Sequence, residues 1–500
     1  MPDKESSPYQ DQKLRNIAGD MPIEEFRRHG HAAIEWLARF LESIETRPVL
    51  PAIRPGHVIA QLPAQTPPQG ETIEHILEDF DRIIVPALTH WNHPGFMAYF
   101  ANTGSAPGIL GELLTAGLNA NAMLWKSAPA ASELELVVAG WVRELLGLPD
   151  DFFGFILDTA STSTLCALLA ARHRATAGRD RSDGLWQLPP SVVYCSEQAH
   201  SSVERAAIAA GFGQRHVRKI PVDGQYSMRA ADLRLAIEQD RADGRLPACV
   251  VATVGTTSST AIDPVPAIAE ICSRDNVWLH VDAAYAGMAA ILAERRDTLA
   301  GCEAADSLVV NPHKWLFTPM DCSLLYCRDS AALKHSLSLT PEYLRTAESG
   351  TAVNLMDYGF QLGRRFRALK LWMILRYYGV EGLRRRIRDH IAMAQQFAAR
   401  LKASGEFEVM APHPFSVVCF RYVAGRNLPD ETLDALNERL MDAVNATGEI
   451  FLSHTRLGGR YVIRLAIGNI RTAPVHVERA FELLCDHGRR LATLPARTVD

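Results

Sequence analysis

Lys314 is the residue of this sequence with the clearest chemical potential. It follows 307–311, an apolar-rich run that predicts a short buried strand, and Pro312 ends that run because proline cannot donate to a sheet. The lysine lies between His313 and Trp315, so we expect its ammonium to be partly desolvated, which lowers a lysine's pKa. A neutral lysine amine can attack a carbonyl and form a Schiff base. The same residues also fit a surface lysine at a strand end.

A hydroxyl-rich stretch follows another predicted strand, 152–157. Thr159, Ala160 and Ser161 begin a predicted helix there. The N–H groups at a helix N-terminus, together with hydroxyl donors, suit a phosphate group, although ordinary N-capping explains the same residues. The sequence contains neither GxxxxGK[ST] nor GxGxxG. It therefore indicates neither a nucleoside triphosphate nor a dinucleotide.

His200 and Thr257 follow two further predicted strands, and Asp282 ends a third, with Ala284 two residues after the aspartate. A single histidine after a strand is commonly structural. An aspartate that closes a buried strand needs a cationic or donor partner, and a small alanine leaves room for a flat ring. A ligand with a phosphate, a pyridine ring and an aldehyde would use all these groups, and pyridoxal phosphate is such a ligand.

The elements that must position these residues form an alternating pattern of strands and helices. Continuous apolar strands indicate a sheet covered on both faces, so we predict a mostly parallel α/β sheet. Ligands of such sheets bind at the carboxyl ends of the strands, where the candidate residues gather. The predicted strands are 152–157, 191–195, 249–255, 277–282, 307–311 and 323–327.

Composition excludes several classes of protein. With 52 basic and 57 acidic residues the net charge is -5, so there is no basic footprint for nucleic acid. Nine scattered cysteines form no CxxC pair with metal-like spacing, which predicts reduced thiols in a cytoplasmic protein and no metal site. No apolar run is long enough to span a membrane, and the first 15 residues lack a signal-peptide core.

The chain divides into four predicted regions. Residues 1–20 form a polar arm, and 21–104 form helices that have apolar faces but little core of their own. Residues 105–390 form the large ligand-binding domain, and 391–500 form a small α+β domain. The strands of the small domain are predicted at 415–422 and 461–467, and its helices at 430–446 and 474–492.

An aromatic-dense stretch, 90–108, precedes the large domain and contains Trp91, Tyr99 and Phe100. Aromatic side chains commonly pack a loop onto the core. They equally fit the wall of a binding pocket, and the stretch alone leaves both interpretations open.

Several motifs together carry a resemblance to a known family. Residues 21–490 resemble the aromatic-L-amino-acid decarboxylases, a family of group II pyridoxal-phosphate-dependent decarboxylases. This resemblance implies the fold type I architecture and an obligate homodimer whose active site lies at the interface, with the N-terminal helices clasping the partner. The motifs are THWNHPGFMAYF, SAPAASELE, YCSEQAHSSVERA, VATVGTTSST, WLHVDAAYAG, NPHKWLF, TPEYLR and LGRRFRALKLW.

The resemblance also implies roles for individual residues. Lys314 becomes the Schiff-base lysine, Asp282 the partner of the pyridine nitrogen and His200 the base stacked on the ring, with Ala284 on the other ring face. Tyr343 becomes the proton donor on a mobile loop. The phosphate would be held by Thr159, Ala160, Ser161, Asn311 and His313, with Thr257 near the polar edge of the ring. The substrate-binding residues would be Trp91, Tyr99, Phe100, Asn102, Asn121, Met123 and Gly363.

The expected reaction is decarboxylation of an aromatic L-amino acid to its amine and CO2. Gly363 matches relatives that accept tryptophan-, dopa-, tyrosine- or phenylalanine-like substrates. The alternatives are an aldehyde synthase or transaminase, and a non-catalytic protein of the same fold; an intact Lys314 and Asp282 argue against the last. The segment 344–354 has few apolar anchors and fits a lid.

The sequence departs from the family pattern near the phosphate site. Asp158 stands where relatives usually have glycine, and Thr162 stands where many have an acidic residue. An aspartate beside a phosphate is unfavourable unless it points away. Arg364 and Arg365 fit either a structural or a substrate-facing role.

Overall fold

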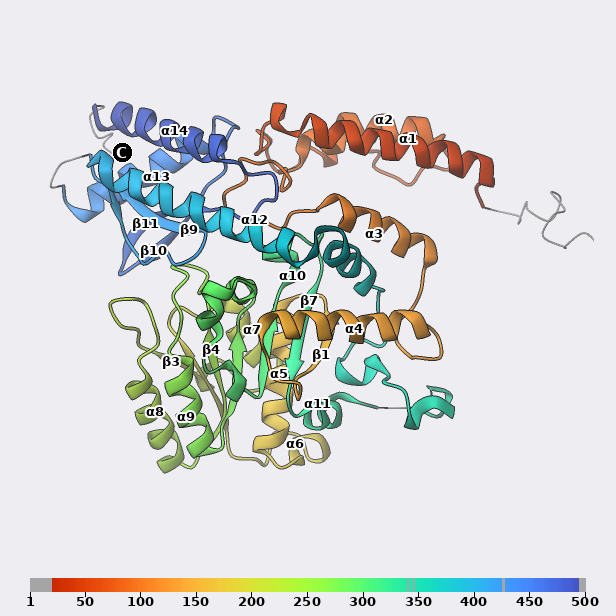
Figure 1. Ribbon diagram of the computed structural model, residues 1–500, viewed down its shortest axis with the longest axis vertical. Coiled ribbons are helices and arrows are strands. Elements are labelled where there is room, and N and C mark those ends of the chain that lie inside the picture. The colour runs from red at the N-terminus through yellow and green to blue at the C-terminus, as the bar shows by residue number, and fades with distance from the viewer. Residues whose placement is uncertain (1–19, 340, 345–346, 425–427, 494–500) are drawn as a thin grey trace, which may run out of the picture.

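A seven-stranded sheet forms the centre of the large domain (Figure 1). The computed structural model describes residues 20–339, 341–344, 347–424 and 428–493. The strand order is β1-β7-β6-β5-β4-β2-β3. The strands are β1 (Phe153–Leu157), β2 (Ser191–Ser196), β3 (Val217–Ile220), β4 (Leu246–Thr253), β5 (Trp278–Asp282), β6 (Ser307–Val310) and β7 (Ser323–Cys327).

The direction of the strands brings the candidate residues to one edge. β3, β2, β4, β5 and β6 pair in parallel, whereas β7 is antiparallel to both of its neighbours, β6 and β1. β1 therefore points the same way as β6. The carboxyl ends of β1, β2, β4, β5 and β6 lie at the same edge of the sheet, as the prediction of a mostly parallel α/β sheet requires.

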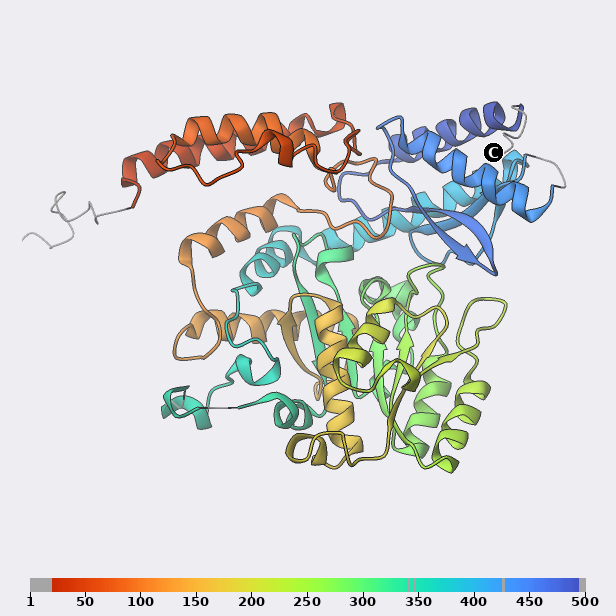
Figure 2. The ribbon, with the colours of Figure 1, turned by 180° about the vertical axis from the view of Figure 1, so that it is seen from behind.

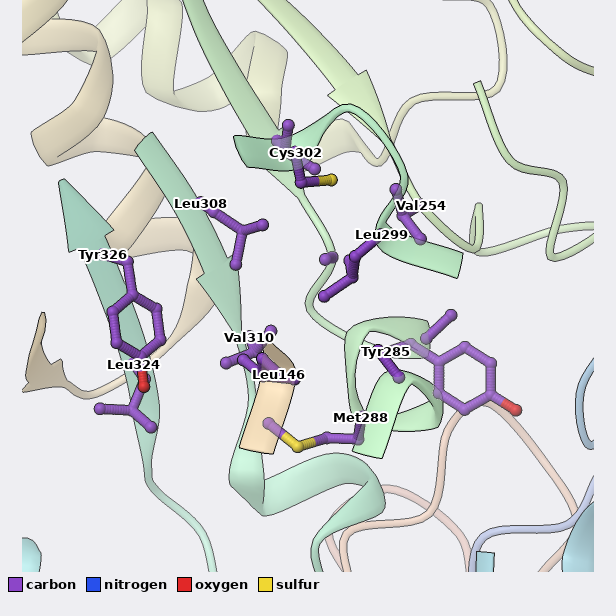
Figure 3. Close-up of a cluster of buried hydrophobic side chains, with 14 of the residues drawn as sticks. Leu146, Val254, Tyr285, Met288, Leu299, Cys302, Leu308, Val310, Leu324 and Tyr326 are labelled. Atoms are coloured by element: carbon purple, nitrogen blue, oxygen red, sulfur yellow. The ribbon is translucent and has the colours of Figure 1, made fainter. Parts of the chain in front are cut away.

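Both faces of the sheet are covered, because alternate residues of each strand enter two different apolar clusters. Leu308 and Val310 of β6 pack in one cluster, and Val309 packs in the other. Figure 3 shows the first cluster, with Leu324 and Tyr326 of β7 on the same face. The helices of the large domain are α4 (Pro129–Leu146), α5 (Ala160–Ala175), α6 (Arg179–Ser182), α7 (Ser201–Ala209), α8 (Ala230–Ala242), α9 (Val265–Asp275), α10 (Pro312–Trp315) and α11 (Ser330–Leu337).

The small domain is built on a four-stranded antiparallel sheet in the order β10-β11-β9-β8, as its predicted α+β class requires. A long helix, α12 (Ala368–Ser404), connects it to the large domain and crosses the predicted boundary at residue 390. The helix is interrupted at Gly379, whose φ of +61° suits glycine. The remaining elements are β8 (Phe407–Val409), β9 (Val417–Tyr422), β10 (Ser453–Leu457), β11 (Arg460–Ala466), α13 (Asp430–Asn445) and α14 (Pro474–Thr493).

The N-terminal helices have little core of their own. α1 (Ile23–Glu42) contains no buried residue, and it packs through Trp36 against Phe80, at the end of α2 (Ile73–Asp79). Both helices extend beyond the body of the molecule in two opposite views (Figures 1 and 2). α3 (Ala106–Leu118) packs on α12. Among the described residues, no helix combines the length and the apolar character that crossing a membrane requires.

Candidate active site

A cavity of about 360 Å³ opens at the carboxyl edge of the large sheet. Five strand ends meet there, so residues that are up to about 150 positions apart in the sequence share one wall. Most of the predicted site residues line the cavity. They are Trp91, Tyr99, Phe100, Asn102, Thr159, Ala160, Ser161, His200, Thr257, Asp282, Ala284, Asn311, His313 and Lys314.

Lys314 lies in α10, the single helical turn that follows β6. Burial lowers the pKa of its ammonium, and the nearby Asp282 carboxylate partly offsets this effect. Its Nζ lies 5.1 Å from the centre of the Phe100 ring. Phe100 stacks on Tyr285 at 3.9 Å, and Tyr285 stacks on Trp315 at 4.9 Å. This aromatic column keeps the lysine in an apolar setting, as the sequence predicts, and favours the neutral, nucleophilic amine.

The N-terminus of α5 is the anion-binding end of the cavity. Its N-cap is Thr159, and no side chain caps the helix, so the N–H groups of the first turn are available to an anion. Asp158 is not part of the cavity wall. Its carboxylate accepts hydrogen bonds from the Thr159 N–H at 2.5 Å and from the Gln361 amide at 3.2 Å. These bonds place the carboxylate beside the backbone of the N-cap residue, outside the cavity wall.

Asp282 and His200 lie on two other strand ends. Asp282 is buried at the end of β5, and its Oδ1 accepts a hydrogen bond from the Ala284 N–H at 3.1 Å. His200 caps α7, where its Nδ1 accepts from the Ser202 N–H at 3.2 Å. The remaining ring proton is therefore on Nε2. Burial, helped by the charge of Lys314, lowers the pKa of His200, so the ring is neutral at pH 7.

Asn311 and His313 form a buried polar network beside Lys314. His313 Nδ1 accepts from the Cys322 N–H at 3.0 Å, and Asn311 Oδ1 accepts from the Ser323 hydroxyl at 2.7 Å. Burial lowers the pKa of His313 to about 3. The network fixes the turn that carries the lysine through hydrogen bonds between neutral groups.

The small domain also contributes to the cavity, which the sequence did not predict. Ser453, His454, Thr455 and Arg464 of β10 and β11 line it. Arg464 is buried, and it donates to the Ser258 carbonyl from Nε and to the Ser453 hydroxyl from Nη1, both at 3.0 Å. Burial lowers its pKa, and within the described residues no carboxylate forms an ion pair with it. The only sequence signal was an arginine inside the apolar strand YVIRLAI.

Comparison with known proteins identifies the family. The model of the pyridoxal-dependent decarboxylase conserved domain matches residues 55–423. The chain belongs to the pyridoxal-dependent decarboxylase family. Tyrosine decarboxylase 4 of Petroselinum crispum is 43% identical over 482 residues, which cover 94% of each chain. Tryptophan decarboxylase 2 of Oryza sativa subsp. japonica is 41% identical over 481 residues, covering 94% of this chain and 96% of the relative.

Solved structures of relatives have the same fold. The crystal structure of Oryza sativa TDC with PLP and tryptamine superposes with a TM-score of 0.92 at 38% identity, covering 95% of this chain and 100% of that one. The structure of Rhodiola rosea 4-hydroxyphenylacetaldehyde synthase gives 0.88 at 34% identity, covering 94% and 99%. The large sheet and small antiparallel domain of this decarboxylase are thus the fold type I architecture.

Pyridoxal phosphate is the cofactor of this decarboxylase, and the cavity fits it. The uncapped start of α5 suits the phosphate, and the buried Asp282 carboxylate suits a protonated ring nitrogen. Lys314 has an amine of lowered pKa that would suit the aldehyde.

Four of the predicted site residues do not line this cavity. Asn121 and Gly363 are exposed, and Asn121 Oδ1 accepts from the Arg364 N–H at 2.9 Å. The Met123 carbonyl accepts from the Met356 N–H at 3.1 Å. Tyr343 lies in the short helix Glu342–Leu344, and its side chain is outside the described part of the structure.

The segment that contains Tyr343 is better anchored than the sequence indicated. Leu344 is only 3% exposed and packs with Leu124 and Met356. This corrects the expectation that 344–354 has few apolar anchors at its start. The segment lies on the same side of the molecule as α3 and α4 in both views (Figures 1 and 2).

The structure separates the two arginines that the sequence left open. Arg364 is buried and forms an ion pair with the buried Glu135 at 2.6 Å, so it does not face the cavity of its own chain. Arg365 is half exposed and pairs with Glu112.

Proposed function

We propose that this pyridoxal-dependent decarboxylase converts an aromatic L-amino acid into the corresponding amine and CO2. The observation that carries the proposal is the position of Lys314: its amine of lowered pKa shares one cavity with Asp282 and the start of α5. Trp91, Tyr99 and Phe100 give the cavity an aromatic wall that suits an aromatic side chain. The relatives named as tyrosine and tryptophan decarboxylases support the same substrate class.

Four residues of the chain have separate roles in the proposed reaction. When bound, the cofactor supplies an electron sink for the pair left behind by CO2. Asp282 would keep a proton at the ring nitrogen, Lys314 would provide the attacking amine, and the neutral His200 ring would lie beside the cofactor. Tyr343 would deliver a proton to Cα after CO2 has left.

Arg464 is the substrate-binding residue that the sequence did not indicate. We propose that its buried guanidinium binds the α-carboxylate of the amino acid, because it is a cation at the cavity wall with no carboxylate partner among the described residues. The charge attraction disappears when CO2 leaves, so the amine product is held less tightly than the substrate.

We also propose a homodimer with the active site at the interface. α1 has no buried residue, and Phe26 on it and Leu113 on α3 are 61% and 51% exposed. Large exposed apolar side chains on these helices favour an interaction surface. In the dimer, Asn121, Met123, Gly363 and Tyr343 would complete the partner's cavity.

The nine cysteines are all free and buried, in keeping with a reducing, cytoplasmic location.

A second candidate function is aldehyde synthesis. Relatives named phenylacetaldehyde synthase are 40% identical to this chain. Tyr343 favours simple decarboxylation, because the resemblance makes it the proton donor. The Tyr343→Phe variant should consume O2 and water and form aldehyde, CO2, ammonia and hydrogen peroxide; a variant that forms only amine and CO2 would remove Tyr343 from this role.

A panel of L-amino acids tests the proposal. The purified holoenzyme should release CO2 and amine in equal amounts from tyrosine, dopa, tryptophan or phenylalanine, and should not act on glutamate or histidine. Release of aldehyde and peroxide by the wild type would favour the second function. Absence of CO2 release from every aromatic amino acid would refute both.

A further inference from the structure

A buried ion pair connects the cofactor end of the large sheet to the turn that holds the displaced site residues. Glu135 of α4 is 1% exposed and Arg364 is 6% exposed, with Nη2 and Oε1 2.6 Å apart. Both side chains also form hydrogen bonds with the backbone of Ile156. The Ile156 N–H donates to Glu135 at 2.8 Å, and the Ile156 carbonyl accepts from Arg364 at 2.6 Å. Ile156 is three residues before Thr159, the N-cap of α5.

The backbone of Arg364 holds a different part of the chain. Its N–H donates to Asn121 Oδ1 at 2.9 Å, and its carbonyl accepts from the Ala122 N–H at 2.8 Å. The turn fixed in this way also holds the end of the lid segment. Asn354 Oδ1 accepts from the Trp125 N–H at 3.1 Å, beyond the contact between Met123 and Met356.

Arg364 thus connects two groups of residues, of which only the first lines the cavity described above. The first is the α5 start, which lines the cavity that contains Lys314. The second is the group Asn121, Met123 and Gly363, which lies outside that cavity and which we define as the substrate wall. Under the proposed function, the substrate wall faces the cavity of the partner subunit.

We propose that Arg364, with Glu135, is a positioning residue that serves both active sites of the dimer. Its side chain fixes the strand leading to the phosphate-binding turn in its own subunit, and its backbone fixes the substrate wall presented to the partner. The inference rests on the proposed dimer. A single nitrogen, Nη2, donates to both the Glu135 carboxylate and the Ile156 carbonyl, and the planar guanidinium holds that nitrogen in place more rigidly than the flexible stem of a lysine would.

If Arg364 contributed only to stability, a variant that keeps the wild-type stability would also keep the wild-type cofactor and substrate constants. Replacing a buried ion pair by apolar residues of similar volume often preserves stability. The double variant Glu135→Leu/Arg364→Met should therefore unfold close to the wild-type temperature. If Arg364 positions both sites, apoenzyme titrated with pyridoxal phosphate should bind it at least 10-fold more weakly, and KM for the best aromatic substrate should rise at least 10-fold. Wild-type values for both constants in this folded variant would overturn the proposal.

Mixed dimers test the division between the two sites. Each mixed dimer contains one Lys314→Ala subunit, so only the other subunit keeps Lys314 in its active site. We call that active site the live site. In the first, Arg364→Met is on the subunit with the live site; in the second, it is on the Lys314→Ala subunit. A mixed dimer with Arg364 intact in both subunits is the matched control. The visible absorbance of the lysine-bound cofactor reports the live site alone.

We expect weaker cofactor binding and a raised KM to appear in different mixed dimers. The first mixed dimer should bind the cofactor weakly at the live site but keep the control KM. The second should bind the cofactor as tightly as the control but have a raised KM. The proposal would be overturned if one mixed dimer showed both defects, or if neither mixed dimer differed from the control. If Arg364→Met does not fold, Arg364→Lys carries the same expectation. An inactive or monomeric control would instead refute the proposed function, so the two failures can be distinguished.

Discussion

At the scale of single residues, the buried cations of this protein fall into two groups. Lys370 pairs with Glu112, Arg421 pairs with Asp430 and Asp434, and Arg364 pairs with Glu135. Arg464 is buried and Lys314 is half-buried; neither forms an ion pair among the described residues, and burial lowers the pKa of both. A buried charge without a partner is costly in a folded protein. Both side chains line the same cavity, which favours it as the place where charged ligands bind.

Replacing Arg464 tests its proposed contact with the substrate carboxylate. Arg464→Met should raise KM for the amino acid by roughly 10- to 100-fold, because a charge-assisted hydrogen bond contributes about 1.5–3 kcal/mol. The inhibition constant of the amine product, which lacks the carboxylate, should change little. Arg464→Lys, the matched control, should keep part of the substrate affinity. Equal weakening of amino acid and amine would assign Arg464 a structural role.

The sequence was informative for residues that follow strands directly. Lys314, Asp282, His200 and Thr159 could be predicted to meet because parallel strands bring their carboxyl ends to one edge. Arg464 could not be predicted, because nothing in the sequence shows which strand of the small domain faces the large one. The exclusion of Asn121 and Gly363 from this cavity was equally invisible, since it depends on how the turns that carry them pack in three dimensions.

At the scale of elements, the contact between α3 and α12 depends on glycine. A Cβ at Gly111 would lie 2.6 Å from the Lys370 Cα, which is backbone and cannot move aside. At Gly117, on the same helix, nothing lies within 4 Å of such an atom. The close approach lets Lys370 lie buried on α12 while it reaches Glu112 on α3.

These two glycines make a matched pair. Gly111→Ala should lower the free energy of unfolding by about 1–3 kcal/mol, because overpacking forces the two helices apart. Gly117→Ala should raise it by about 0.5–1 kcal/mol, since alanine is the better helix former. Urea unfolding of the two variants and the wild type measures both effects. Equal effects of the two substitutions would show that the helices do not need this close approach.

Six of the seven strands of the large sheet could be predicted from the sequence. β3 was missed because its residues VRKI are half polar and the strand lies at the sheet edge. The reversed direction of β7 was also missed, because a strand that is apolar on both faces carries no signal of its direction. In the small domain, β8 has three residues and β10 has polar residues at most positions, so neither has a clear apolar pattern.

At the scale of the whole molecule, the exposed apolar side chains of α1 and α3 are the strongest argument for a dimer. Phe26→Glu or Leu113→Glu should convert the protein to an inactive monomer, because burying a carboxylate in an apolar interface is unfavourable. Sedimentation equilibrium measures the association. Leu235→Glu, on α8 and 56% exposed, is the matched control and should remain dimeric. Dimeric, active Phe26→Glu and Leu113→Glu variants would place the interface elsewhere.

Buried histidines make the stability dependent on pH. Burial lowers the pKa of His280, His313 and His390 to about 4, 3 and 4. The unfolded chain binds these protons near pH 6.5, so stability falls as the pH decreases below that value, by about 1.4 kcal/mol per pH unit for each proton. Asp263 opposes this, because burial raises its pKa to about 6 and its proton stays on the folded chain. For these four groups together, the unfolded chain binds about two protons more than the folded chain near pH 5.

Urea unfolding of the holoenzyme at pH 7, 6 and 5 measures this dependence. The midpoint should fall with each step and should fall more between pH 6 and 5 than between pH 7 and 6. A midpoint that stays constant or rises towards pH 5 would show that these rings are not held neutral in the folded protein.

The identity of the cofactor-bearing lysine is the central claim and can be measured directly. Borohydride reduction of the holoenzyme should fix the cofactor covalently, and peptide mass spectrometry should find the phosphopyridoxyl mass on the peptide containing Lys314. Lys314→Ala should show neither this adduct nor the visible absorbance of the bound cofactor, and should not release CO2. An adduct on another lysine of the wild type, or an active Lys314→Ala variant, would contradict the account.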